Sequence, residues 1–134
     1  MIRRRLLAIP LLLGLAACQA PSPRMAEAGT APVRVVFFNQ DSAALDEGGL
    51  AVVREAAAAA RAAPRAPVAV LGFAGPVGSQ GYNQALSDAR ARHVADELVA
   101  AGVEPARIAI RPRGPVPFEQ MPTESRRVEI RIGG

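Results

Sequence analysis

The stretch YNQALSDARA, residues 82–91, decides the fold, because it fixes the position of the longest helix. Apolar side chains recur in and after this stretch at the spacing that places them on one face of a helix. They are Tyr82, Leu86, Ala89, Val94 and Leu98. Gly102 follows the last of them, and glycine is common just past a helix end. The pattern predicts a helix over residues 82–101.

Strands are predicted on both sides of this helix. Residues 68–73, Val-Ala-Val-Leu-Gly-Phe, are nearly all apolar, as in a central strand that helices cover. Residues 108–110 begin another strand, and the proline-rich residues 112–122 connect it to the last one. In residues 128–132, Val-Glu-Ile-Arg-Ile, apolar and charged side chains alternate. This alternation is typical of a strand with one face in water.

A strand and a helix are also predicted before residue 68. Residues 33–38, Val-Arg-Val-Val-Phe-Phe, are rich in branched and aromatic side chains and predict the first strand. Asp46 and Glu47 then introduce an alanine-rich helix that continues to Ala63 and stops at Pro64. The complete order, β-α-β-α-β-β, predicts a two-layer α/β sandwich.

The N-terminus has the pattern of an export signal. Three arginines at positions 3–5 precede an apolar run at positions 6–15, which is too short to span a bilayer as a helix. Leu15-Ala16-Ala17-Cys18 contains the only cysteine and resembles the lipobox of bacterial lipoprotein precursors. The resemblance implies cleavage before Cys18 and acylation of Cys18. The alternative interpretations are a plain secretory signal with a chance cysteine, or a buried thiol.

The same resemblance implies a location in the cell and a division of the chain into three segments. Gln19, and not aspartate, follows the cysteine, and lipoproteins of this type usually reach the outer membrane. We expect residues 1–17 to be the signal peptide, residues 18–32 to be the lipidated cysteine and a flexible tether, and residues 33–134 to be a domain facing the periplasm. The tether is rich in proline and small residues without apolar periodicity. Fully extended, it reaches at most about 50 Å.

The mature chain has little net charge. Three of the sixteen arginines leave with the signal, so 13 basic side chains face 12 acidic ones in the remaining 117 residues. A balance near +1 argues against a nucleic-acid partner bound by massed neutralisation of phosphates. The length suffices for one domain with one hydrophobic core.

Four blocks of sequence occur in an order shared with a known family. They are Val36-Phe37-Phe38 with Leu45, Gly72-Phe73 followed by Gly78, YNQALSDARA at 82–91, and RRVEI at 126–130. They resemble the OmpA-like C-terminal domain, a periplasmic module that holds peptidoglycan, and the resemblance covers nearly all of the chain from Val33 onward. It implies an OmpA-like two-layer fold and peptidoglycan as the partner.

The resemblance also implies a binding site for diaminopimelate, the stem-peptide residue whose side chain ends in an ammonium and a carboxylate. Arg90 matches the family's arginine, and a guanidinium can bind a carboxylate through two parallel hydrogen bonds. Asn83 lies two helical turns before Arg90 on the same face. Arg126 matches a further binding arginine in the last block.

The chain departs from the family pattern beside this site. Where members have Thr-Asp, this sequence has Ala74-Gly75, so the acid that holds the ammonium is absent. Losing one charged hydrogen-bond partner costs about 1.5–3 kcal/mol, or roughly ten- to a hundredfold in affinity. Asp41 lies after the first strand, where members often carry a ligand-contacting asparagine, and it is the candidate replacement. Ser125 also stands in place of the family's terminal asparagine.

Each candidate residue also has a structural interpretation. Arg90 could pair with Asp41 or another acid in a salt bridge, and Asn83 could cap the helix. Arg126 could be a solvated charge beside a strand, and Asp41 a turn residue. His93 has no second ligand beside it and gives no case for a metal.

Catalysis and a cofactor are not expected. The glycines at positions 72–81 are not followed by the Gly-Lys-Ser/Thr sequence of a phosphate loop. A serine nucleophile, Ser79 or Ser87, would need the one histidine as its base and an acid that orients this histidine. Two hypotheses remain. In the first, a lipoprotein links the outer membrane to peptidoglycan through a weakened diaminopimelate site. In the second, a degenerate domain no longer binds peptidoglycan and acts in protein interactions within an envelope complex.

Overall fold

The computed structural model describes residues 32–117 and 122–133. Its elements are β1 (Arg34–Phe37), α1 (Glu47–Ala62), β2 (Val68–Ala74), α2 (Gln80–Ala100), the 3-10 helix η1 (Pro105–Arg107), β3 (Ile108–Pro115), α3 (Pro122–Ser125) and β4 (Arg127–Ile132). The predicted order of strands and long helices is confirmed. The short helices η1 and α3 are additions to it.

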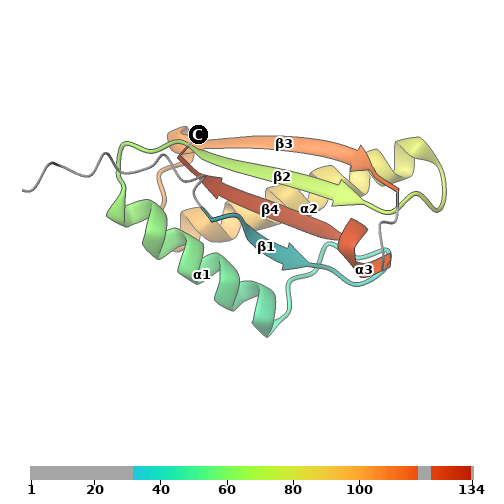
Figure 1. Cartoon of the computed structure of the whole chain (residues 1–134), viewed down its shortest axis with the longest axis horizontal. Helices are drawn as coiled ribbons and strands as arrows, with labels where there is room; N and C mark the ends of the chain where they lie inside the picture. The colour runs from blue at the N-terminus through green and yellow to red at the C-terminus, as the bar shows by residue number, and fades with distance from the viewer. Residues whose placement is uncertain (1–31, 118–121, 134) are drawn as a thin grey trace, which may run out of the picture.

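The four strands form one mixed sheet in the order β1-β4-β2-β3. β2 and β3 are parallel and are joined through α2, whereas β4 is antiparallel to both β1 and β2. Figure 1 shows α2 passing behind the strands and α1 running beside β1. The predicted two-layer sandwich is therefore confirmed.

The core lies between the sheet and the two long helices. β4 alternates as predicted, because Val128, Ile130 and Ile132 are buried while the charged residues between them lie on the other face. Val36 of β1 is in register with Val128, and Val70 of β2 is in register with Ile130. These branched side chains pack with the alanine-rich side of α1. The opposite face of the sheet carries none of the described helices.

α2 buries a different face in its first half from the one that its apolar periodicity predicted. Tyr82 is 47% exposed and Ala89 is exposed, although Val94 and Leu98 are buried as expected. The buried residues in the first half are polar ones, namely Asn83, Ser87 and Arg90. Each of them donates a hydrogen bond to a backbone carbonyl, so burial leaves their polar groups satisfied.

α2 packs close to β2 because Gly72 has no side chain. A Cβ on Gly72 would overlap the backbone oxygen of Ser87 and would meet the Cβ of Ala91 at 3.0 Å. The Oγ of Ser87 also accepts a hydrogen bond from the backbone N–H of Gly114 in β3 at 3.0 Å. These contacts hold the first half of α2 over the ends of β2 and β3.

Two boundaries differ from the predictions. Ser79 caps α2 by accepting a hydrogen bond from the backbone N–H of Tyr82 at 3.1 Å, so the helix begins at Gln80. β3 continues through Pro112 to Pro115, where only a connection was predicted. β3 is an edge strand, and the missing N–H of a proline is tolerated on its unpaired side.

The described elements form one folding unit. The strands and helices that the structure describes lie between Arg34 and Ile132 and share one core, which is what independent folding requires. The predicted signal peptide, Cys18 and the tether up to residue 31 lie outside the described residues. None of the helices between residues 32 and 133 that the structure describes has the length and apolarity to cross a bilayer.

Candidate functional site

A cavity of about 450 Å³ lies past the carboxyl ends of β1 and β2, beside the start of α2. All four residues predicted to bind the ligand line it, namely Asp41, Asn83, Arg90 and Arg126. They come from the loop after β1, from α2 and from the segment before β4. Gly75, which stands where the family has its acid, also lines the cavity. The fold therefore brings together residues that were predicted from separate blocks of sequence.

Arg90 forms the floor of the cavity, and its exposed fraction is 0%. Its Nε donates to the carbonyl of Ser42 at 2.8 Å, its Nη1 to that of Phe73 at 3.1 Å, and its Nη2 to that of Asn39 at 3.0 Å. The guanidinium thus ties the loop after β1 to the end of β2. The suggested salt bridge to Asp41 or another acid is wrong for the described residues, since none of their ion pairs includes Arg90.

The guanidinium of Arg90 retains its charge beside the cavity, and two of its N–H groups make no bond to a described carbonyl. A guanidinium has five N–H groups, and the three bonds to carbonyls leave two of them. Burial first, and the positive charge of Arg126 second, lower the pKa of Arg90 to about 10, so it remains protonated at neutral pH. It also lies over the ring of Phe38, 5.3 Å from the centroid. Two neighbouring cations at one cavity favour an anionic ligand group.

Asn83 holds the loop after β2. Its side chain is buried, and its Nδ2 donates to the carbonyl of Val77 at 2.8 Å. The interpretation of Asn83 as the helix cap is wrong, because Ser79 occupies that position.

Arg126 is half-buried, so its interpretation as a solvated charge is wrong too. Its Nε donates to the carbonyl of Phe38 at 3.1 Å, and its Nη2 donates to the Oγ1 of Thr123 at 3.2 Å. The neighbouring Ser125 is buried and donates to the carbonyl of Pro122 at 2.7 Å. These bonds hold the guanidinium of Arg126 beside the cavity.

Asp41 supplies a carboxylate at the cavity. It lies in the turn after β1 with φ of +51°, a left-handed conformation that aspartate and asparagine adopt more readily than most residues. Its Oδ1 accepts a hydrogen bond from the phenol of Tyr82 at 3.2 Å. Within the described residues its Oδ2 has no bonded partner, so this oxygen is available to a ligand. Asp41 is thus both the turn residue and the cavity residue that were weighed as alternatives.

Tyr82 is a site residue that the sequence did not indicate. Its spacing assigned it to the apolar face of the helix, but its ring lines the cavity and its hydroxyl contacts Asp41. Desolvation first, then the hydrogen bond and charge of Asp41, raise the pKa of Tyr82 above its usual value. Its role could have been inferred from its position directly before Asn83, at the start of the helix that follows the glycine-rich loop.

We expect the phenol of Tyr82 to titrate above a pH of about 10, the usual midpoint for tyrosine. Asp41→Asn should lower this midpoint, because the negative charge that disfavours the phenolate is removed. The chain has one tyrosine and no tryptophan, so the ultraviolet absorbance of the phenolate reports Tyr82 alone. Equal midpoints in the two proteins would show that the contact between Tyr82 and Asp41 is not made in solution.

His93 does not line the cavity, and the described residues offer no metal site. Its Nδ1 lies 2.7 Å from the carbonyl oxygen of Ala43, and its Nε2 lies 3.8 Å from the carboxylate of Glu97. In residues 32–117 and 122–133, no three His, Cys, Asp or Glu side chains gather as metal ligands would. The cavity instead combines two guanidinium groups, an amide and one carboxylate, which suits a small zwitterion.

The model of the OmpA family matches residues 37–130 of the chain. Outer membrane protein A of Bordetella avium is 33% identical over 104 residues, which are 73% of this chain and 54% of that protein. Peptidoglycan-binding protein ArfA of Mycobacterium tuberculosis is 36% identical over 101 residues, which are 71% of this chain and 31% of that protein. The chain thus spans about half of the length of these relatives or less.

Solved structures share the fold. The crystal structure of the peptidoglycan-associated lipoprotein from Burkholderia pseudomallei matches with a TM-score of 0.68 and 23% identity, over 74% of this chain and 89% of that one. The periplasmic domain of MotB from Helicobacter pylori matches with a TM-score of 0.65 and 19% identity, over 78% of this chain and 77% of that one.

Proposed function

The chain belongs to the OmpA family, and from this membership we propose that its domain binds peptidoglycan through the cavity that Arg90 floors. One observation carries the proposal. Asp41, Asn83, Arg90 and Arg126, predicted from three separate stretches of sequence, line the same cavity, and Asp41 brings to it the carboxylate that Gly75 does not provide. The names of ArfA and of the lipoprotein from Burkholderia pseudomallei support the same ligand.

The proposed ligand group is the side-chain end of diaminopimelate. Its carboxylate would lie on the remaining N–H groups of Arg90, with Arg126 adding positive charge. Its ammonium would lie on the Oδ2 of Asp41, whose other oxygen Tyr82 already holds. Each of these hydrogen bonds is charge-assisted, and such bonds are roughly twice as strong as neutral ones.

We further propose that the domain is attached to the outer membrane through lipid on Cys18, after removal of residues 1–17. Several acyl chains on one residue give stable attachment, whereas one chain binds only marginally. The domain, residues 33–134, would then stand in the periplasm on a tether of residues 18–32, linking the membrane to the wall. We assign binding and no catalytic step, because the one histidine does not line the cavity and the one cysteine is taken by lipid.

A second candidate function is favoured by Gly75. This residue lines the cavity where the family places an acid, and glycine has no side chain to bind an ammonium. If Asp41 fails to replace that acid, the domain keeps the fold without the ligand and serves as a protein-interaction part of an envelope complex.

Co-sedimentation with two kinds of peptidoglycan distinguishes the two functions. Residues 19–134 contain the whole folding unit, and we expect them to pellet with diaminopimelate-type peptidoglycan. Lysine-type peptidoglycan is the matched control, because lysine has the ammonium but lacks the side-chain carboxylate that Arg90 would bind. The domain's affinity for this control should be roughly ten- to a hundredfold lower. A protein that stays in solution with both polymers would favour the second function.

A further inference from the structure

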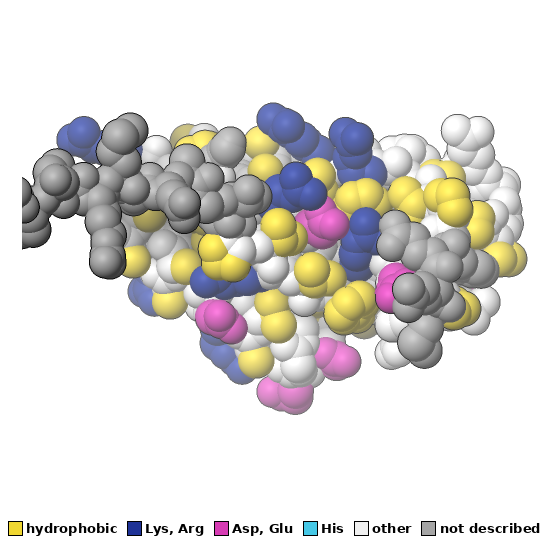
Figure 2. All heavy atoms as spheres, viewed as in Figure 1, with side chains coloured by type: hydrophobic (Ala, Val, Ile, Leu, Met, Phe, Trp, Pro, Cys, Tyr) yellow, Lys and Arg dark blue, Asp and Glu magenta, His cyan; other side chains and the backbone are white. Residues whose placement is uncertain are grey.

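The open face of the sheet is strongly basic. Within the part of the chain that the structure describes, its charged strand residues are Arg111 and Arg113 on β3, and Arg127, Glu129 and Arg131 on β4. Four arginines against one glutamate give this face a net charge of +3. Figure 2 looks onto this face and shows dark-blue side chains spread over the strands among yellow ones. The face is separate from the cavity, which lies past the strand ends and is lined by none of these residues.

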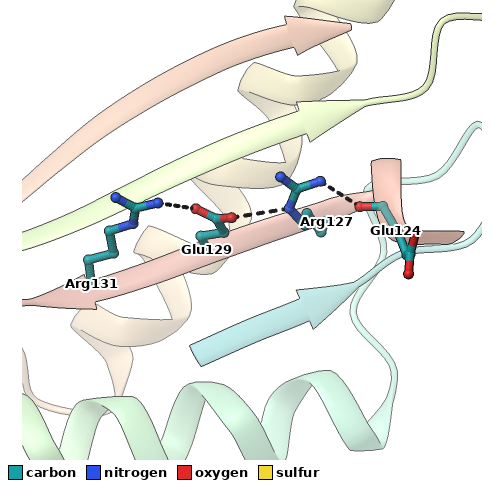
Figure 3. Close-up of polar contacts among 4 residues, drawn as sticks. All are labelled: Glu124, Arg127, Glu129 and Arg131. Atoms are coloured by element: carbon teal, nitrogen blue, oxygen red, sulfur yellow. Dashed lines mark hydrogen bonds and ion pairs between the residues drawn. The ribbon is translucent and has the colours of Figure 1, made fainter. Parts of the chain in front are cut away.

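The arginines on β4 are held flat against the sheet. Glu129 lies between them, with its Oε1 3.2 Å from the Nε of Arg127 and its Oε2 2.8 Å from the Nη2 of Arg131, as Figure 3 shows. Arg127 also donates to the backbone carbonyl of Glu124 at 2.7 Å and lies over the ring of Phe73, 4.1 Å from its centroid. These contacts fix the positions of Arg127 and Arg131 on the open face of the sheet.

The arginines on β3 have no such partners. Arg111 and Arg113 are exposed and form no hydrogen bond or ion pair with any other described residue. At the other edge of the sheet, Phe37 points to the same face, in register with Arg127, and is 49% exposed. The face therefore presents unpaired guanidinium groups and one exposed aromatic ring.

The charge is unevenly distributed over the domain. α1 and α2, which cover the other face of the sheet, carry five acidic residues against four arginines, and one of those arginines is the buried Arg90. Arg34 of β1 also lies on this side, 3.6 Å from Glu55 of α1, so the domain is positive on its sheet side and nearly balanced in charge on its helix side. A nearby anionic surface would orient it with the sheet side inward.

We propose that the open face of the sheet, with Arg111, Arg113 and Phe37 at its two edges, docks on the surface of a bilayer that contains anionic phospholipid. This inference rests on the proposed lipid anchor at Cys18, which would hold the domain within about 50 Å of such a surface. Guanidinium groups bind phosphate through paired hydrogen bonds, and an exposed phenylalanine ring can be buried at the boundary between headgroups and acyl chains.

The tether compensates for the modest strength of this contact. A basic residue near an anionic membrane contributes about 1 kcal/mol, so a net charge of +3 gives weak binding for a free domain. A short flexible linker raises the effective concentration of the domain at the surface to the millimolar range, where weak binding populates the docked state. When the domain is docked on this face, the membrane does not cover the cavity, because the cavity lies past the strand ends.

The test is sedimentation of residues 19–134, which lack the lipid, with vesicles of phosphatidylcholine containing about a third phosphatidylglycerol. The variant R111Q/R113Q should lower the partition coefficient roughly thirtyfold, from two charges at about 1 kcal/mol each. The matched control R54Q/R61Q removes two exposed arginines from α1, so its net charge equals that of R111Q/R113Q. It should nevertheless bind like the wild type, because α1 lies on the other side of the sheet. F37S should weaken binding without a change in charge.

Three results would overturn the proposal. They are no binding at millimolar lipid, equal binding to pure phosphatidylcholine, or equal losses in R111Q/R113Q and R54Q/R61Q. The first would leave the face to an acidic protein. Sedimentation with peptidoglycan is measured on the same variants and should not change, because Arg111 and Arg113 do not line the cavity. A failure of lipid docking is thereby distinguished from a failure of wall binding.

Discussion

Arg90→Ala is expected to lower the free energy of unfolding by about 3–5 kcal/mol, a large part of the stability of a small domain. The substitution removes the guanidinium donors from the carbonyls of Ser42 and Phe73 and leaves that of Asn39 with only the N–H of Ser42 at 3.3 Å. Each buried group left unsatisfied costs about 1–3 kcal/mol. It also opens a void beneath the cavity. Urea unfolding followed by circular dichroism measures the effect.

Two further variants separate geometry from charge. Arg90→Lys should also be strongly destabilising, because one ammonium on a flexible stem cannot reproduce a planar fork that spans three carbonyls. Arg92→Ala, on the same helix, removes an exposed arginine whose bond to Asp88 lies at the surface, and it should change stability by less than about 1 kcal/mol. If Arg90→Ala were as stable as Arg92→Ala, the three carbonyl bonds would not hold the fold together.

Asp41→Asn is expected to weaken binding to diaminopimelate-type peptidoglycan by roughly ten- to a hundredfold, the value of one charged hydrogen-bond partner. Asparagine is nearly the same size, tolerates a φ of +51°, and keeps an oxygen that can accept the hydrogen bond of Tyr82. The fold should therefore be unchanged, and co-sedimentation should report the lost charge alone.

Gly75→Asp tests the same site from the other side. Gly75 is not among the described glycines with positive φ, so its backbone conformation does not require glycine. The substitution should strengthen wild-type binding and should restore binding to Asp41→Asn. If Asp41→Asn has no effect while Gly75→Asp creates binding, Asp41 does not replace the family acid, and the natural domain has lost the ligand.

The fold was predictable because its strands and its first helix follow simple patterns. The alternation in residues 128–132 and the apolar residues 68–73 each indicated a strand by themselves. The buried face of α2 was not predictable in the same way. Arg90 is buried because the loop after β1 and the end of β2 offer it carbonyls, whereas Asn83 bonds to the loop just before the helix and Ser87 to its own helix. Apolar periodicity contains no information on those partners.

The candidate site was predictable only as far as the family blocks reached. They indicated Asn83, Arg90 and Arg126, and the missing acid drew attention to Asp41. The pairing of Tyr82 with Asp41 joins residues 41 positions apart, and it depends on how the loop after β1 turns. The bonds from Arg90 to three carbonyls also depend on that loop. The sequence alone therefore suggested a salt bridge for Arg90 instead.

The chain enters the domain at the start of β1, and the cavity lies past the end of the same strand. In a wall tether, tension would therefore run lengthwise through β1. The bonds between β1 and β4 lie across that direction, so the pairs from Arg34↔Ile130 to Phe37↔Arg127 would be loaded together in shear and would not peel apart one at a time. If the proposed wall contact exists, we expect it to dissociate before strands loaded in shear separate, so the domain would stay folded and could bind again.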